Sequence, residues 1–418
     1  MPPLVVDACA VAGLAVMLAV AFGHPKALVE VLVGTACAGV VLAVGAVGPA
    51  GAYREARLLL PVVAFLAAIL LVAELCALEG LFAAVGGLVA RAARARPGRM
   101  LALTFVAASL VTAVLSLDAT VVLLTPVVAA AATGSGLVRR PAVFACARLA
   151  NSASLLLPVS NLTNLLALPS LPKLSFVGFG VLMLPVWLAV IAVEYVGHRV
   201  FFASDLSQPG HGGEGAHEVA LPVVPTVVVG LMLVGFAALY PLGVQPAWVA
   251  AVAALVLTGY ALRRRRVRAA GLVAAAQLPF AYFVLCLGVV VAGLAHTFLG
   301  HLVHSLVPSG HGLSALLAVA LLAMLLANVV NNLPATLLLV PMVAPLGTTA
   351  VLAALIGLGA GSGLTYTGSL ANLLWRRTLA AQGHRVSTRE FHALSALVTL
   401  PAVALGVTVL WVWAPLVR

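Results

Sequence analysis

Long apolar runs recur along the whole chain, and short polar segments separate them. About 20 helical residues are needed to cross a bilayer core of roughly 30 Å. Runs of about this length predict ten membrane helices, over residues 4–22, 27–48, 58–90, 142–166, 174–197, 222–240, 247–262, 270–294, 351–375 and 394–415. The pattern therefore predicts an all-α polytopic membrane protein.

Two further apolar stretches, 100–133 and 313–350, contain polar residues near the middle. The halves of the first stretch, 100–115 and 119–133, have 16 and 15 residues. At a rise of about 1.5 Å per residue each half reaches about 23–24 Å, which is short of the bilayer core. We therefore predict two re-entrant hairpins, each of which enters and leaves the membrane on the same side.

Composition agrees with a membrane fold and excludes a soluble one. Of 418 residues, 64% are hydrophobic and 8% are charged, whereas a soluble domain averages about 25% charged residues. The net charge of +11 reflects short arginine clusters at 91–99, 139–140, 263–268 and 376–389. Because such clusters mark cytoplasmic loops, the charge predicts the orientation of the chain in a plasma (inner) membrane and no nucleic acid partner.

The two halves of the chain resemble each other. SNLTNLL at 160–166 matches GSLANLL at 368–374 with an offset of 208, and ATVVLLTPVV at 119 matches ATLLLVPMV at 335. Since the charge pattern orients the two hairpins oppositely, we predict the inverted repeats typical of secondary transporters. The predicted parts are N-terminal scaffold helices at 1–57, repeat 1 at 58–197, a polar cytoplasmic linker at 198–221 and repeat 2 at 222–418.

Polar residues interrupt the apolar pattern in four places: at the two hairpin tips and within the spans 142–166 and 351–375. Backbone freed from helix inside a membrane is tolerated where it is buried in protein or lines a cavity. A shared solute site is therefore predicted, and the alternative for any single hydroxyl is a hydrogen bond between helices. The candidate solute-binding residues are Ser116, Thr120, Asn151, Ser160, Asn161, Asn164, Asn331, Asn332, Thr336, Ser369 and Asn372.

Asp118 is the one carboxylate at a predicted hairpin tip. An ionisable group inside a membrane is a functional candidate, and burial favours its neutral form, so we predict a proton carrier. The alternative is that Asp118 caps the second half-helix near a water-filled mouth. No Lys or Arg lies in the tip motifs, which favours a small, neutral, hydroxyl-rich solute. Elsewhere, Glu74 is expected near the cytoplasmic interface rather than facing the helix bundle, and Arg148 is expected to extend to water rather than to contact the substrate.

No catalytic, metal or cofactor motif is found in the sequence. The five cysteines lie singly in separate apolar segments, so a trivalent metalloid would be held as an uncharged oxyacid by hydrogen bonds rather than by thiols. The glycine-rich segment 357–363 follows no predicted strand, so it favours close helix packing over a dinucleotide loop. We therefore predict a transporter without a cofactor, and no enzyme.

The motifs resemble the arsenite efflux pump family (arsenical pump membrane proteins) of the ion transporter superfamily, over nearly the whole chain. The resemblance is carried by HPK at 24–26, LSLDATVVLLTPVV at 115–128, ANSASLLLPVSNLTNLL at 150–166, NNLPATLL at 331–338 and GSLANLLWRRTL at 368–379. It implies an elevator-type or rocking transporter with a scaffold and two hairpins. It also implies export of As(OH)₃ and antimonite, driven by proton entry or coupled to an ATPase subunit.

The chain departs from the family pattern at charged positions of the breaks. Asn151 stands where the pattern has an acid, and Leu117 where it has an asparagine. Gly359 and the segment 361–363 lack the acid and the lysine of the pattern. The predicted solute site is therefore neutral apart from Asp118.

We predict from these features an exporter of arsenite and antimonite as neutral hydroxides, in exchange for protons. The alternatives are a sodium- or proton-coupled anion carrier of the dicarboxylate type, a silicic acid transporter of the same superfamily, and a channel or structural membrane protein. The expected partners are the metalloid oxyacid, the proton and the lipid bilayer. A homodimer and a separate ATPase subunit stay open as further partners.

Overall fold

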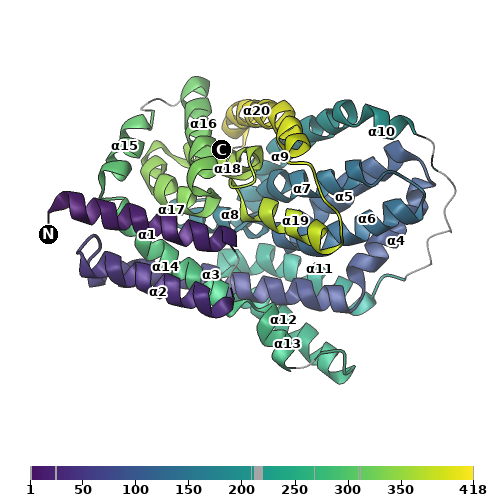
Figure 1. Cartoon of the computed structure of the whole chain (residues 1–418), viewed down its shortest axis with the longest axis horizontal. Coiled ribbons are helices and arrows are strands. Elements are labelled where there is room, and N and C mark those ends of the chain that lie inside the picture. The colour runs from purple at the N-terminus through teal and green to yellow at the C-terminus, as the bar shows by residue number, and fades with distance from the viewer. Residues whose placement is uncertain are drawn as a thin grey trace.

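The computed structural model of the chain describes residues 2–23, 26–208, 210, 220–267, 269–308, 310 and 312–417. All regular elements in these ranges are helices, as the hydrophobic pattern predicts (Figure 1). Nine of the described helices are long and apolar enough to span a membrane. The chain is thus an all-α, multi-pass membrane protein. Part of the predicted linker 198–221, His24 and Pro25 of the family motif, and Arg268 lie outside the described residues.

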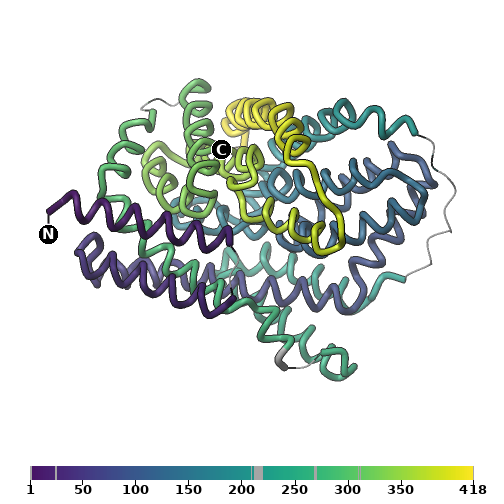
Figure 2. The backbone as a smooth tube through the Cα atoms, in the orientation of Figure 1, coloured from purple at the N-terminus to yellow at the C-terminus, as the bar shows by residue number. Residues whose placement is uncertain are grey.

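The helices follow one another along the chain as the tube in Figure 2 traces them. The first half contains α1 (Pro3–Gly23), α2 (Ala27–Ala43), α3 (Pro49–Leu78), α4 (Leu81–Ala93), α5 (Pro97–Leu115), α6 (Thr125–Gly134), α7 (Arg140–Ser152), α8 (Leu162–Ala167), α9 (Phe176–Phe201) and α10 (Ala203–Ser207). The second half contains α11 (Val223–Leu239), α12 (Pro246–Arg263), α13 (Ala269–Ala275), α14 (Leu278–Leu294), α15 (Phe298–Leu306), α16 (Leu313–Val330), α17 (Asn332–Val343), α18 (Thr348–Gly359), α19 (Leu370–Ala381) and α20 (Thr388–Trp413). Short π or 3₁₀ segments are η1 (Ala119–Leu124), η2 (Ala153–Leu155), η3 (Pro158–Ser160), η4 (Leu168–Ser170), η5 (Tyr240–Leu242), η6 (Ala344–Leu346), η7 (Ala360–Leu364) and η8 (Ala414–Leu416).

A scaffold unit combines helices from both halves of the chain. The helices α1 and α2 pack on α14, and α3 packs on α12 and α14 (Figure 1). Because α3 already begins at Pro49, the predicted boundary after residue 57 falls inside a helix. The span predicted at 58–90 is two helices. The first, α3, ends at Leu78, and Gly80, with φ of 88°, changes the direction of the chain before α4 begins at Leu81.

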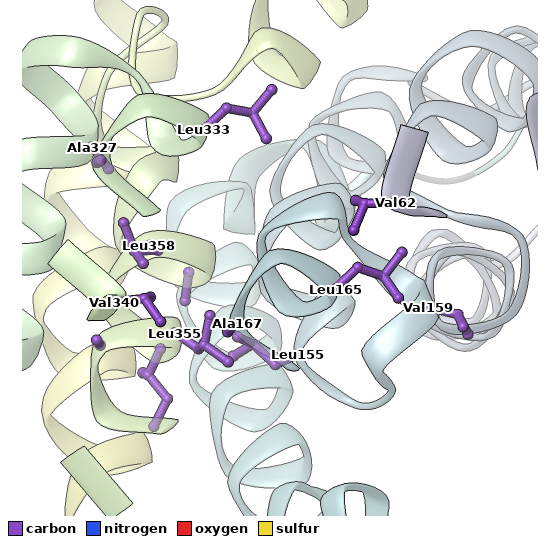
Figure 3. Close-up of a cluster of buried hydrophobic side chains, with 14 of the residues drawn as sticks. Val62, Leu155, Val159, Leu165, Ala167, Ala327, Leu333, Val340, Leu355 and Leu358 are labelled. Carbon is purple, nitrogen blue, oxygen red and sulfur yellow. The ribbon is translucent and has the colours of Figure 1, made fainter. Parts of the chain in front are cut away.

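A second unit contains the polar breaks. The helix α9 packs along α20, α5 packs on α7, and α16 packs on α18. The helices α7 and α18 end within the predicted spans 142–166 and 351–375, and short 3₁₀ turns follow before α8 and α19 begin. Figure 3 shows that Leu155 of the first break lies in the same region as Leu355 of α18 and Val340 of α17. Both spans are therefore interrupted where the polar residues predict.

Each hairpin turns at a non-glycine residue in the left-handed region, Ser116 with φ of 113° and Asn331 with φ of 73°. Both residues lie at the predicted tips, between α5 and η1 and between α16 and α17. The first arms, α5 and α16, have 19 and 18 residues, so they are longer than the halves from which re-entrance was inferred. Re-entrance and the inverted relation of the repeats stay predictions.

Ion pairs join helix ends that the arginine pattern places on the cytoplasmic side. Arg140 at the start of α7 lies 2.9 Å from Glu390 at the start of α20. Arg264, just after α12, lies 3.0 Å from Glu79, just after α3. These contacts agree with a common cytoplasmic placement of the four ends.

Candidate functional site

The half-helices α8 and α19 each begin with a side-chain cap. Oδ1 of Asn161 accepts a hydrogen bond from the backbone N–H of Thr163 at 3.1 Å, and Oγ of Ser369 accepts one from the N–H of Ala371 at 3.3 Å. Asparagine and serine are preferred at this position because their oxygens reach the free N–H groups of the first turn. The chain therefore starts a new helix in the middle of each span.

One asparagine in each half-helix organises the backbone of its break. Nδ2 of Asn164 donates to the carbonyls of Ser154 and Leu157, at 2.8 and 3.0 Å. Nδ2 of Asn372 donates to the carbonyls of Ser362 and Thr365, at 3.2 and 2.8 Å. All three pairs of corresponding residues are 208 positions apart, so the two breaks share a hydrogen-bond pattern as well as a sequence motif. This agreement supports the predicted duplication.

The two breaks are joined through Asn151 of α7. Nδ2 of Asn151 donates to Oδ1 of Asn372 at 2.7 Å, and Oγ of Ser362 lies 3.4 Å from Oδ1 of Asn151. The corresponding residue in the second half is Gly359, which has no side chain to offer, and Oδ1 of Asn164 has no hydrogen-bond partner among the described residues. The pseudo-symmetry is therefore broken at one polar contact.

We expect Asn372→Ala to destabilise the protein more than Asn164→Ala. The Asn372 side chain makes three hydrogen bonds and that of Asn164 makes two, and each buried group left unpaired costs about 1–3 kcal/mol. Thermal unfolding of both variants in detergent measures the difference, and Thr408→Ala, which removes an exposed hydroxyl bond within α20, is the control. A larger loss for Asn164→Ala would contradict this assignment.

Several predicted site hydroxyls and amides have partners inside the protein. Oγ of Ser160 donates to the carbonyl of Ala113 at 2.7 Å, and Oγ1 of Thr120 lies 2.7 Å from Oγ1 of Thr112. In the second half, Nδ2 of Asn331 donates to the carbonyl of Thr367 at 3.0 Å, and Thr336 bonds within α17. These residues therefore make hydrogen bonds between or within helices, which was the alternative to solute binding for each of them.

A cavity of about 700 Å³ lies where the tips and the half-helices meet. It is lined by both hairpin tips, by the first residues of α8 and α19, and by parts of α2, α3, α13 and α14. Five of the predicted site residues are in its lining: Ser116, Asp118, Asn161, Asn332 and Ser369. The other seven lie outside the lining and bond to backbone or side chains within the protein: Thr120, Asn151, Ser160, Asn164, Asn331, Thr336 and Asn372.

The cavity is acidic. The charged residues in its lining are Asp118, Glu30 of α2 and Glu74 of α3, and each side chain is partly exposed. No Lys, Arg or His is among the described lining residues. Glu74, which was expected near the cytoplasmic interface, thus lies on the face of α3 that lines the cavity beside the first hairpin tip. Sequence reasoning missed Glu30, whose signal is an acid in the first turn of an apolar helix.

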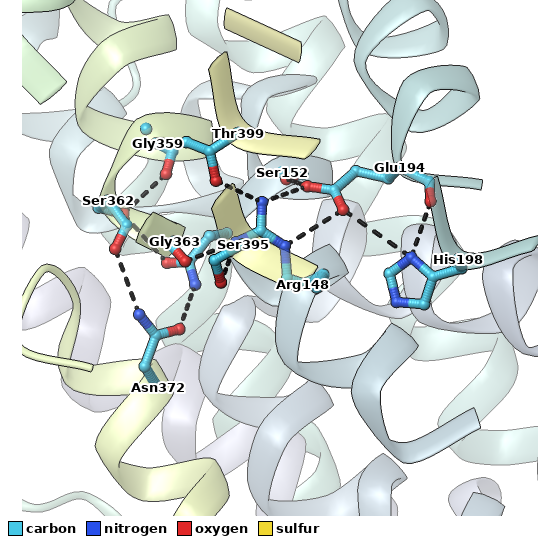
Figure 4. A network of polar contacts seen from close by, with 12 residues as sticks. Arg148, Ser152, Glu194, His198, Gly359, Ser362, Gly363, Asn372, Ser395 and Thr399 are labelled. Atoms are coloured by element: carbon cyan, nitrogen blue, oxygen red, sulfur yellow. Dashed lines mark hydrogen bonds and ion pairs between the residues drawn. The ribbon is translucent and has the colours of Figure 1, made fainter. Parts of the chain in front are cut away.

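Arg148 does not extend to water as the sequence predicted. Its side chain is 1% exposed and its Nη2 lies 2.7 Å from Oε1 of Glu194, which is fully buried in α9. Oγ of Ser152 also donates to Glu194 at 2.7 Å, and Nδ1 of His198 lies 2.7 Å from the Glu194 carbonyl (Figure 4). The ion pair explains why snorkelling is not needed, since both charges have partners within the protein.

The signal for this network was present in the sequence. Glu194 and His198 are one helical turn apart near the end of an apolar run, and a basic residue lies well inside another apolar run. Two opposite charges at membrane depth suggest a pair. The two charges meet only if their helices are neighbours. In the structure α7 packs on α9, and this packing brings Arg148 and Glu194 together.

Comparison with known proteins places the chain among transporters. The citrate transporter family model (CitMHS) matches residues 5–356. An arsenical pump membrane protein of Escherichia coli K12 is 30% identical over 311 residues, which cover 70% of this chain and 72% of that protein. This chain belongs to the arsenical pump membrane protein family. The arsenical pump membrane protein of Yersinia enterocolitica is 29% identical over 319 residues, with the same coverage. The chain is therefore a membrane transporter and not an enzyme.

Proposed function

We propose that the chain is a secondary active exporter of arsenite and antimonite, carried as neutral hydroxides in exchange for protons. The observation that carries this proposal is the charge of the cavity, which combines carboxylates, amides and hydroxyls with no cationic side chain among its described lining residues. An uncharged As(OH)₃ needs hydrogen-bond partners but no counter-ion. The names of the two relatives support the same class of solute.

The lining offers both kinds of hydrogen-bond partner that a neutral hydroxide needs. Helix N-termini carry free N–H donors, and Leu162 and Leu370, the first residues of α8 and α19, line the cavity. Asp118 and the carboxamide of Asn332 supply acceptors for the O–H groups of the solute. Ser116 adds a hydroxyl that has no hydrogen-bond partner among the described residues.

The position of the cavity suits uptake of the solute from the cytoplasm. Its lining includes the segment 273–275 of α13, which follows the arginine cluster at 263–268 that is expected on the cytoplasmic side. In the proposed cycle, Asp118 carries one proton inward and the neutral solute leaves. A protonated Asp118 is uncharged, whereas the solute-loaded site crosses with Asp118 ionised, so each exchange of a neutral solute for a proton carries one positive charge inward.

Expression in a cell that lacks its own arsenite pump tests the solute. We expect the chain to raise the arsenite and antimonite concentrations that such cells tolerate, because export lowers the internal metalloid level. The control is the Asp118→Asn variant at equal abundance in the membrane. Unchanged tolerance with the protein confirmed in the membrane would remove arsenite and antimonite as the solutes.

A citrate carrier is the second candidate, because the matched family model describes citrate transporters. A cavity of about 700 Å³ would accommodate citrate, so size does not separate the candidates. Charge does, since three carboxylates in the lining repel a multivalent anion. The test measures uptake of labelled citrate and of arsenite into everted vesicles. Comparing the two solutes identifies the substrate, and comparing a proton with a sodium gradient identifies the coupling ion. Uptake without ATP shows that no ATPase subunit is needed.

A further inference from the structure

Arg148 is a buried cation whose hydrogen-bonding capacity is fully used. A guanidinium has five N–H donors. Nε and Nη2 donate to the carboxylate of Glu194 at 3.2 and 2.7 Å, and Nη2 also donates to Oγ1 of Thr399 at 3.0 Å. Nη1 donates to Oγ of Ser395 at 3.1 Å and to the carbonyl of Gly363 (Figure 4). No donor is left for a solute, and Arg148 is not among the residues that line the cavity.

The bond to Gly363 is the one that connects Arg148 to the second break. Gly363 belongs to η7, the 3₁₀ segment of the second break, whereas Arg148 belongs to α7 in the first half of the chain. A Cβ atom on Gly363 would lie 2.6 Å from Nη1 of Arg148. The guanidinium therefore occupies the space that a side chain at position 363 would need, and it sets the place of this turn.

Two short routes lead from Arg148 to Asn372 at the start of α19. Along the first, the carbonyl of Ser362, next to Gly363, accepts from Nδ2 of Asn372 at 3.2 Å. Along the second, Glu194 accepts from Ser152, whose neighbour Asn151 donates to Oδ1 of Asn372 at 2.7 Å. Asn372 lies one residue beyond the segment 369–371, which lines the cavity. Both routes therefore end at the half-helix that faces the solute.

A contribution to the stability of the fold does not by itself explain why the Arg148–Glu194 ion pair is present. Taking two charges out of water offsets most of their attraction, and replacing such a pair by apolar side chains is often neutral or stabilising. The observed contacts are more specific, because they connect α7, α9, α20 and η7 at one point. We propose that Arg148 is a positioning residue, which holds the N-terminus of α19 in its solute-binding place through Gly363 and Asn372. This inference rests on the proposed transport function.

The test uses the paired variant Arg148→Met with Glu194→Leu, which removes both charges and leaves neither one unpaired. We expect a thermal midpoint close to that of the wild type. The KM for arsenite in everted vesicles should rise about tenfold, equivalent to about 1.4 kcal/mol, with kcat changed less than about threefold. Amide hydrogen exchange of segment 360–372 should become faster, while exchange in 176–190 of α9 stays as in the wild type.

Arg140→Met is the matched control, because Arg140 lies at the other end of the same helix, where its half-exposed side chain pairs with Glu390 and with the buried Asp205. It should leave both the KM and the exchange of 360–372 unchanged. Gly363→Ala removes no charge but displaces the guanidinium, so it should reproduce the raised KM and the faster exchange.

A paired variant that folds and keeps the wild-type KM and exchange overturns the proposal. If the paired variant does not fold, Arg148→Lys decides: its single nitrogen keeps the charge beside Glu194 but does not serve Gly363, Ser395 and Thr399 together. Wild-type KM and exchange in Arg148→Lys would overturn the proposal. If the wild type carries no arsenite, the proposed function fails on its own, and the exchange of 360–372 still tests the link from Arg148 to α19.

Discussion

Asp118→Asn abolishes proton-driven arsenite transport but leaves solute binding largely intact, if the tip carboxylate carries the proton. Asparagine has nearly the same shape as aspartate and still offers an acceptor, but it does not take up and release a proton in the physiological pH range. We expect the rate driven by a pH gradient to fall at least about 100-fold, the low end of the loss when a proton-transfer group is removed.

Proteoliposomes with an imposed pH gradient provide the measurement, with total arsenic determined by mass spectrometry. Equilibrium binding of arsenite to the purified variant shows whether the site itself persists. Asp7→Asn is the matched control, because Asp7 caps the N–H of Phe298 at 3.2 Å and does not line the cavity. Wild-type pH dependence in Asp118→Asn would remove this residue from the coupling mechanism.

Gly357→Ala is expected to have the largest effect on stability. A Cβ atom at this position would lie 2.1 Å from the carbonyl oxygen of Ala320 and 2.8 Å from Cβ of Ala323. The first of these neighbours is backbone, so α16 would have to move away from α18. Overpacking of a core typically costs about 1–3 kcal/mol, and we expect a loss at the upper end of this range or above it.

The thermal midpoint in detergent and the arsenite transport rate both report on this change, because α16 and α18 hold the second hairpin and the second break. Gly259→Ala in α12 is the control, since nothing lies within 4 Å of its added Cβ atom. A Gly357→Ala protein as stable as the control variant would show that the two helices do not need this close approach.

The positions of the polar breaks could be predicted from the sequence. Ser116 and Asn331 mark the tips, and Asn164 and Asn372 lie in matching motifs, because polar residues that interrupt an apolar run have few stable places in a membrane. The structure agrees, because the chain turns at Ser116 and Asn331, and Asn164 and Asn372 lie in the first turns of α8 and α19. What these residues contact was harder to predict, since seven of the proposed ligands bond to the protein behind the cavity.

The buried ion pair and the cavity acids could not be assigned from the sequence. Arg148 and Glu194 are 46 residues apart, and sequence alone does not say which membrane helices are neighbours. The direction of Glu74 could not be assigned either, because the long apolar run in which it lies contains two helices. Both gaps come from the same cause, which is that hydropathy reports the environment of a segment and not the direction of each side chain.

By itself, the sequence determined the membrane class, the all-helical fold, the arginine-marked ends and the places where helices break. These features depend on local composition, because each segment must match lipid, water or a buried cavity wherever it lies. Only the tertiary structure decided that Glu30, Glu74 and Asp118 share one cavity, and that Arg148 reaches across the two halves to Gly363. Those contacts depend on how separate helices pack, and packing is a property of the whole chain rather than of any one segment.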